Sequence, residues 1–129
     1  MHLQKHEQYG LLLMGELASV GNDQLISLVE VSRRHGVSVP FLKKIVSSLR
    51  ASRLVQSKEG VGGGYKLARK PEHISLWEII SSFDTGNEWN IVDSACPINK
   101  SCLPQHIRAI VSENIKDRLE RISLYEVVL

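Results

Sequence analysis

The sequence of 129 residues has only two cysteines, Cys96 and Cys102, and no long apolar run. Two cysteines are too few for a disulfide-stapled fold in a chain of this length. No apolar stretch approaches the roughly 20 residues that a membrane-spanning helix needs, and no signal-peptide core follows the charged N-terminus. We therefore expect a cytoplasmic protein with no membrane partner.

The sequence patterns of enzymes and nucleotide-binding proteins are also missing. The glycine-rich run 60–64 is not followed by the Lys-Ser/Thr of a phosphate-binding P-loop, and no βαβ unit surrounds it. No paired carboxylates and no Ser/His/Asp arrangement stand in a context that favours catalysis. We therefore expect a protein that is not an enzyme.

The chain does have an ordinary globular composition with an uneven distribution of charge. Hydrophobic residues make up 43% and charged residues 23%, as is typical of one globular domain. The formal net charge is only +2, yet residues 27–70 hold 10 Lys/Arg against 2 Asp/Glu. A basic segment of this kind indicates contact with nucleic acid. The alternative is that the charges simply cluster on solvated helix faces.

Apolar periodicity and capping signals predict four helices before residue 84, over 4–20, 27–35, 38–52 and 71–83. Ser27 with Glu30, and Ser75 with Glu78, have the spacing of a capping box. Gly36 stands where a helix commonly ends, and Ser38 is expected to cap the helix after it. Two glycines inside the first helix, at positions 10 and 15, are tolerable where a neighbouring helix packs closely.

The stretch 38–67 organises the chain. Its helix places four apolar residues on one face, and the opposite face is small and cationic. Residues 54–58 and 64–68 predict two short strands joined by a glycine-rich turn. The expected fold class is therefore mainly α with a small β-hairpin wing, a winged helix-turn-helix. The inward-facing residues of its helix are Leu42, Ile45, Val46 and Leu49.

This layout predicts that the helix enters the major groove of DNA while the hairpin contacts the minor groove or its phosphates. Lys58 and Lys66 are the expected charges of the wing, and Arg50 and Arg53 flank the helix. The glycines of the wing are equally consistent with the demands of a tight hairpin, and both roles can hold together. The residues predicted to bind DNA are Ser38, Pro40, Lys43, Lys44, Ser47, Arg50, Lys58, Gly60, Gly62, Gly63 and Tyr65.

Beyond residue 83 the sequence predicts a loop and then a long helix. Residues 84–102 have no periodicity, and loops of that length are commonly functional or disordered. The final helix, roughly Leu103–Tyr125, has an apolar stripe that one small winged domain does not cover, so we expect it to pair with a second copy. The alternative is that it packs back on its own domain. The expected dimer interface is Ile107, Ile110, Val111, Ile115, Leu119 and Ile122.

The run from Ser27 to Ile80 resembles the IscR/NsrR-type (Rrf-two) bacterial transcription regulators. The pattern G-x-GGGY-x-L lies at Gly60–Leu67, and a helix beginning I-[ST]-L starts at Ile74. The resemblance covers nearly the whole chain and implies a homodimeric winged-helix regulator of double-stranded DNA. It divides the chain into a DNA-binding domain (1–83), a sensory loop (84–102) and a dimerisation helix (103–129).

Two departures from the family pattern bear on function. Glu59 stands where many members carry an arginine suited to the minor groove, and a carboxylate near DNA is repulsive. Several members also bind an iron–sulfur cluster, usually through three loop cysteines. Cys96 and Cys102 match the last two, but Asn90 replaces the first. With His106 near the fourth-ligand region, the candidate metal ligands are Cys96, Cys102 and His106.

The functional prediction is a homodimeric transcriptional regulator, a repressor, that binds a palindromic operator. Three means of control stay open for the 84–102 loop: an iron–sulfur cluster, a redox switch of the two cysteines, or a cluster-less response to a metabolite or partner protein. The alternative function is a protein-interaction dimer that uses the winged fold as a scaffold and binds DNA weakly or not at all. Glu59 favours this alternative, and the basic excess over 27–70 opposes it.

Overall fold

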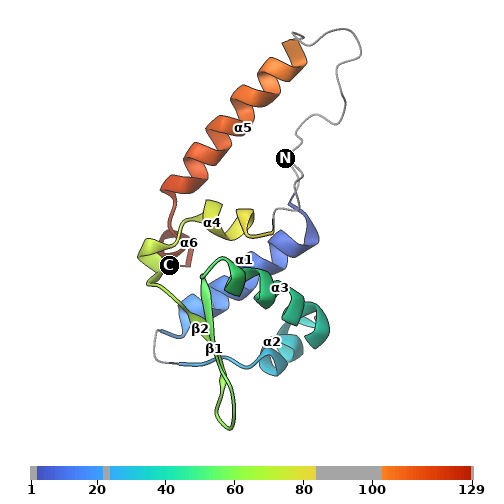
Figure 1. Ribbon diagram of the computed structural model, residues 1–129, viewed down its shortest axis with the longest axis vertical. Coiled ribbons are helices and arrows are strands. Elements are labelled where there is room, and N and C mark those ends of the chain that lie inside the picture. Colours follow the sequence, from blue (N-terminus) through green and yellow to red (C-terminus); the bar gives the residue numbers. More distant parts are fainter. Residues whose placement is uncertain (1–2, 22–23, 84–102, 129) are drawn as a thin grey trace.

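The computed structural model describes residues 3–21, 24–83 and 103–128. Figure 1 shows that most elements form one body, from which α5 projects. In chain order the elements are α1 (Lys5–Ser19), α2 (Leu28–His35), α3 (Val39–Ala51), β1 (Val55–Lys58), β2 (Gly64–Leu67), the 3-10 helix η1 (Pro71–His73), α4 (Leu76–Ser81), α5 (Leu103–Arg121) and α6 (Leu124–Val128). The mainly helical fold with a two-stranded wing is confirmed.

The core of the body forms around α1, which contacts α3, α4, α6 and β2. Leu13, Met14 and Leu17 recur on one face of α1 and are buried. The same apolar cluster reaches Ile79 of α4 and Leu124 of α6, so the last short helix belongs to the body. The inward face predicted for the third helix is confirmed, since its apolar residues are all buried: Leu42, Ile45, Val46 and Leu49.

The two glycines of α1 differ in their surroundings. A Cβ at Gly10 would collide with the ring of Phe83, which packs directly on the helix backbone there. Close packing is therefore confirmed at Gly10, although the neighbour is the residue that follows α4 rather than a helix. At Gly15 an added Cβ would meet no atom of the described chain within 4 Å, so close packing does not account for the glycine there.

The helix-turn-helix is formed by α2 and α3 with the turn 36–38 between them. Gly36 has a φ of 66° and donates its N–H to the carbonyl of Ser32, so it ends α2 as predicted. Ser38 caps α3 by accepting the N–H of Phe41 at 3.3 Å. Ser27 caps α2 through the N–H of Val29 at 3.2 Å. The predicted capping box with Glu30 is therefore wrong, because the hydroxyl bonds one residue earlier in the first turn.

The end of α3 contains a strained residue that the sequence pattern did not indicate. Arg53 has a φ of 60°, and no other non-glycine residue in the described part of the chain has a positive φ. Its N–H donates to the carbonyl of Arg50 at 2.9 Å, and the N–H of Leu54 donates to that of Leu49 at 3.0 Å. These two bonds form a Schellman motif, in which the left-handed position is usually glycine.

The wing is an antiparallel hairpin whose register is Val55↔Leu67, Gln56↔Lys66, Ser57↔Tyr65 and Lys58↔Gly64. Opposed residues share a face, and faces alternate along a strand. The buried pair Val55 and Leu67 therefore faces the core, while Lys58 and Lys66 share the outer face. Ile26, before α2, exchanges two backbone hydrogen bonds of 2.9 Å with Tyr65 and so attaches the wing to the body.

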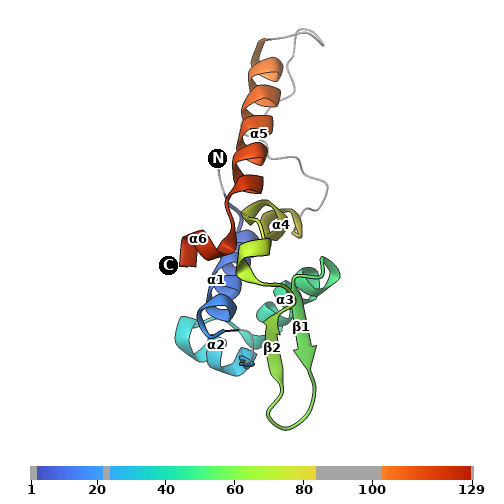
Figure 2. The same ribbon diagram turned by 90° about the vertical axis from the view of Figure 1, so that its left-hand side faces the viewer.

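The final helix is shorter than predicted, because α5 ends at Arg121 rather than near Tyr125. Ser123 then caps α6: it accepts the N–H of Glu126 and donates its own N–H to the Glu126 carboxylate at 3.0 Å. This Ser-x-x-Glu spacing was a readable signal for a new helix start. Figures 1 and 2 show α5 projecting from the body while α6 returns to it. No helix in the described ranges is long and apolar enough to cross a membrane.

Candidate nucleic-acid interface

The outward face of α3 carries the polar residues that the sequence predicted. Because α3 buries one face in the core, the opposite face is left to solvent. Lys43 and Lys44 lie at its centre, and Arg50 lies one to two turns further along. The predicted DNA-contacting residues of this segment are all exposed: Ser38, Pro40, Lys43, Lys44, Ser47 and Arg50. The face therefore presents cations and small hydrogen-bonding groups without a bulky side chain between them.

The tip of the wing adopts a conformation that needs glycine. Gly60 and Gly62 have φ values of 97° and 75°, which non-glycine residues rarely adopt. A Cβ at Gly63 would collide with the carbonyl of Lys58 and lie 2.9 Å from that of Gly60. Val61 between them is fully exposed at the tip. The predicted wing glycines are thus required by the turn itself, and their proposed contact with DNA comes in addition.

Gly64 and Tyr65 begin β2, directly after the turn of the wing. A Cβ at Gly64 would lie 2.7 Å from the carbonyl oxygen of Ile26, so only glycine permits the bridge that fastens the wing. Tyr65 is half-buried and packs against the core, and its backbone makes that bridge. Tyr65 was predicted to bind DNA, and the geometry adds a structural role that the sequence pattern did not indicate.

Two groups of basic residues in the body differ in their partners. Arg34 and His35 both contact the carboxylate of Glu16, at 2.8 and 2.9 Å, and Arg69 contacts Glu78 at 2.9 Å. A second group, on α3 and the wing, has no carboxylate within 4.0 Å among the described residues: Lys43, Lys44, Arg50, Lys58 and Lys66. Cations without internal partners are available to neutralise phosphates. Charge counting along the sequence could not separate the two groups, because Glu16 is far from its partners in the chain.

The candidate metal ligands are not assembled by the described residues. Asn90, Cys96 and Cys102 lie outside them, and His106 lies in the first turn of α5. Among the side chains that the structure describes, no three His, Cys, Asp or Glu residues form a group that could hold a metal ion. Iron–sulfur clusters are held mostly by four thiolates. The whole sequence has two cysteines, so the thiols of one chain supply at most two of the four ligands.

A capped recognition helix with an exposed basic face, followed by an anchored basic wing, defines a winged-helix DNA-binding protein. Residues 3–129 match the model of the Rrf2 family, described as iron-dependent transcriptional regulators. The chain belongs to this family. It is a DNA-binding transcriptional regulator.

Individual relatives agree with that assignment. The chain is 30% identical to the HTH-type transcriptional regulator IscR of Aliivibrio salmonicida, over 100% of this chain and 78% of that protein. Among solved structures, T. potens IscR is 26% identical with a TM-score of 0.79, covering 99% of this chain and 86% of that one. CymR, the global cysteine regulator of B. subtilis, is 25% identical with a TM-score of 0.80, covering 99% and 96%. These relatives are named as regulators, not as enzymes.

Proposed function

We propose that this regulator is a homodimeric repressor that binds a palindromic operator through α3 and the wing of each subunit. The observation that supports it is the second group of cations, Lys43, Lys44, Arg50, Lys58 and Lys66, which share α3 and the wing and have no carboxylate partner in the described chain. In this arrangement α3 enters the major groove, and the wing reaches the neighbouring minor groove. Repression follows where the operator overlaps the site at which RNA polymerase binds.

The proposed dimer forms through α5, which projects from the body in both views. Its 19 residues span about 28 Å at 1.5 Å per residue. The predicted interface divides in two: Ile107 and Ile110 are exposed by 49% and 59%, whereas the remaining four residues are half-buried in the single chain. We therefore place the centre of the interface on the N-terminal half of α5. Exposed isoleucines on one helix face gain most from burial against a second copy.

Control of the repressor is proposed to reside in 84–102, the segment that connects α4 to α5 in the chain. Because α5 joins the subunits in the proposed dimer, a change in this segment alters the distance between the two copies of α3. That distance must match about 34 Å, one turn of DNA. Operator affinity of Cys96→Ala and Cys102→Ala, measured with and without oxidant, tests whether thiols transmit the signal. Iron and sulfide content of anaerobically purified protein tests for a cluster.

The DNA-binding surface is tested by the salt dependence of binding to duplex DNA. A phosphate contact releases about 0.9 counterions per neutralised charge, so losing one contact lowers the slope of log K against log salt by about 1. We expect that drop for Lys43→Ala and for Lys44→Ala. Arg118→Ala serves as the matched control, because Arg118 is an exposed cation of α5 and belongs neither to α3 nor to the wing.

Equal slopes for the wild type and both lysine variants would contradict the proposed surface. The alternative of a protein-interaction dimer predicts weak binding to duplex DNA with little salt dependence at all. The membership of a family of transcriptional regulators favours the operator-binding function.

A further inference from the structure

Glu78, in the first turn of α4, contacts two segments: the one that follows β2, through Arg69, and the cap of α4, through Ser75. Its Oε2 accepts hydrogen bonds from Nη2 of Arg69, at 2.9 Å, and from the N–H of Ser75, at 3.4 Å. Arg69 lies two residues after the end of β2 and also donates to the carbonyl of His73 at 3.1 Å. The N–H of Glu78 returns a bond to the Ser75 hydroxyl at 3.1 Å, completing the predicted capping box.

Ser75 caps the first turn of α4. The end of α5 is attached to the body at the same place. Ser75 and Ser123 form an antiparallel bridge between the start of α4 and the junction of α5 with α6. The N–H of Leu76 donates to the carbonyl of Ile122 at 2.9 Å, and the N–H of Leu124 donates to that of Ile74 at 2.8 Å. The segment between η1 and α4 and the end of α5 therefore meet at one short joint, which Glu78 contacts through Ser75.

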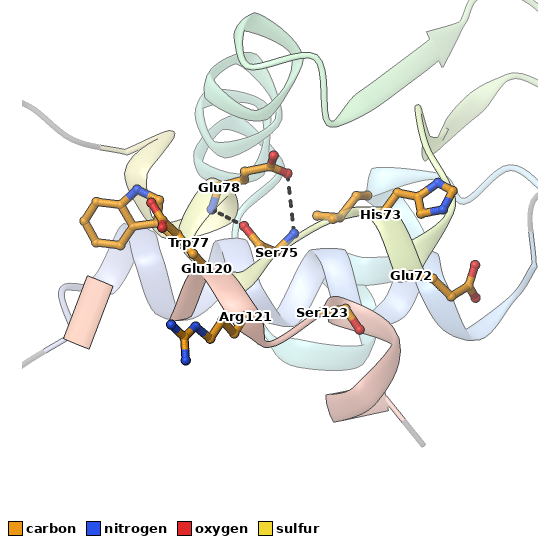
Figure 3. Close-up of a pocket in the computed structure, with 9 residues that line it drawn as sticks. Glu72, His73, Ser75, Trp77, Glu78, Glu120, Arg121 and Ser123 are labelled. Carbon is orange, nitrogen blue, oxygen red and sulfur yellow. Dashed lines mark hydrogen bonds between the residues drawn. The ribbon is translucent and has the colours of Figure 1, made fainter. Parts of the chain in front are cut away.

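The two sides of this joint differ: Ile74 and Leu124 are buried in the apolar core on its inner side, and polar groups lie on its outer side. A groove of about 440 Å³ adjoins it. Figure 3 shows the residues that line this groove, among them Ser75 and Glu78 with the two hydrogen bonds between them. The Nζ of Lys116 on α5 lies 5.5 Å from the ring centre of Trp77, which adds a second link to α4. Most of the groove lining is polar or charged: Glu72, His73, Ser75, Glu78, Glu120, Arg121 and Ser123, with Ile74 and Trp77 as the apolar members. The buried Ile74 and Leu124 hold the inner side of the joint, and the hydrogen bonds and ion pair of Glu78 act on its exposed outer side.

We propose that Glu78 is a positioning residue for operator recognition: through Arg69 and Ser75 it sets the orientation of the wing and α3 relative to α5. The inference rests on the proposed homodimer, in which α5 connects the two DNA-binding bodies. The angle at this joint then fixes how far apart, and how rotated, the two copies of α3 are. Adding one base pair between half-sites shifts them by about 3.4 Å and rotates them by about 35°. A rigid joint therefore favours one spacing between the operator half-sites. A flexible joint allows similar affinity for several spacings.

The test is a spacing profile of operator affinity. A palindromic duplex is first selected from a random pool with the full-length wild-type protein, and its central spacer is then varied from two base pairs shorter to two longer. Glu78→Gln keeps a side chain that can complete the capping box, but it removes the charge that pairs with Arg69. Arg69→Gln removes the same ion pair from the other side. Both variants are also measured on a duplex that carries a single half-site.

Two matched controls remove one negative charge without touching this contact. Glu7→Gln alters the corresponding capping box of α1, and Glu72→Gln alters an exposed carboxylate of the same groove that has no ion pair with any described residue. For the wild type and both controls we expect a loss of about tenfold or more when the spacer changes by one base pair, comparable to one mismatched base pair. For both variants we expect that loss to shrink to about threefold, with unchanged single half-site affinity.

A wild-type profile in either Glu78→Gln or Arg69→Gln would overturn the proposal, as would a broadened profile in the controls. The double variant should match the single ones, because all three lack the same interaction. If the wild type itself showed no preferred spacing, the proposed dimer on a palindrome would fail instead. The two failures are therefore distinguishable in one experiment.

Discussion

Arg53, just after the end of α3, has a strained backbone conformation, and its replacement by glycine tests how much that strain costs. Arg53 occupies the left-handed position of the Schellman motif, with a φ of 60°. Its side chain is exposed and has no ion pair with any residue that the structure describes. Replacing it by glycine keeps both hydrogen bonds of the motif and the burial of Leu49 and Leu54. We therefore expect Arg53→Gly to stabilise the protein.

The size of the effect follows from two opposing terms. An L-residue in the left-handed region costs about 1–2 kcal/mol, which glycine does not incur. Glycine in turn makes the unfolded chain more flexible, which costs about 0.4–1 kcal/mol. The net gain is about 0.5–1 kcal/mol, and in a domain of this size it raises Tm by about 2–6 °C.

Thermal unfolding followed by circular dichroism, with urea unfolding alongside, measures the change. Arg53→Ala is the matched control, because alanine loses the guanidinium but keeps the Cβ that causes the strain. We expect the control to stay within about 0.5 kcal/mol of the wild type. A glycine variant no more stable than the alanine variant would refute the argument from backbone strain.

Three further changes test the wing and the dimer. Gly63→Ala places a methyl group against the carbonyls of Lys58 and Gly60 and so distorts the turn of the wing. Operator affinity, measured by fluorescence anisotropy, should fall by at least about tenfold, while the helical circular dichroism signal stays unchanged. Glu59→Gln removes a carboxylate from the exposed wing, so DNA affinity should rise by about threefold at low salt, and unchanged affinity would show that the wing tip stays away from the phosphates. Ile110→Glu puts a charge in the proposed dimer interface at a side chain that is 59% exposed in the single chain, so we expect a folded monomer in sedimentation velocity. An intact dimer would contradict this position of the interface.

The elements could be read from the sequence wherever their signals are local. The buried face of α3 follows from the i, i+3, i+4, i+7 spacing of Leu42, Ile45, Val46 and Leu49, and the cap at Ser38 lies next to the turn that it ends. The Ser75–Glu78 capping box and the end of α2 at Gly36 likewise need only neighbouring residues. Glycines around the wing turn indicated its conformation for the same reason.

The interface was only partly readable. The exposed lysines of α3 and the wing could be predicted, because amphipathic periodicity assigns them to the outer faces. Which cations are paired with carboxylates could not be predicted from the sequence. Arg34 contacts Glu16, and Arg69 contacts Glu78, only because different elements pack together. The role of Tyr65 depends on Ile26, which lies on a segment before α2.

The sequence by itself determined the helices, the wing and the basic outer face of α3, because periodicity, caps and glycine positions act over a few residues. The Ser-x-x-Glu spacing at Ser123 indicates a new helix start, but only the tertiary structure decided that α6 returns to the body. The reason is energetic: Leu124 is buried beside α1, and the backbone at Ile122 and Leu124 bonds to the turn before α4. Those contacts join residues about fifty positions apart, and together they outweigh the continuation of a regular apolar stripe.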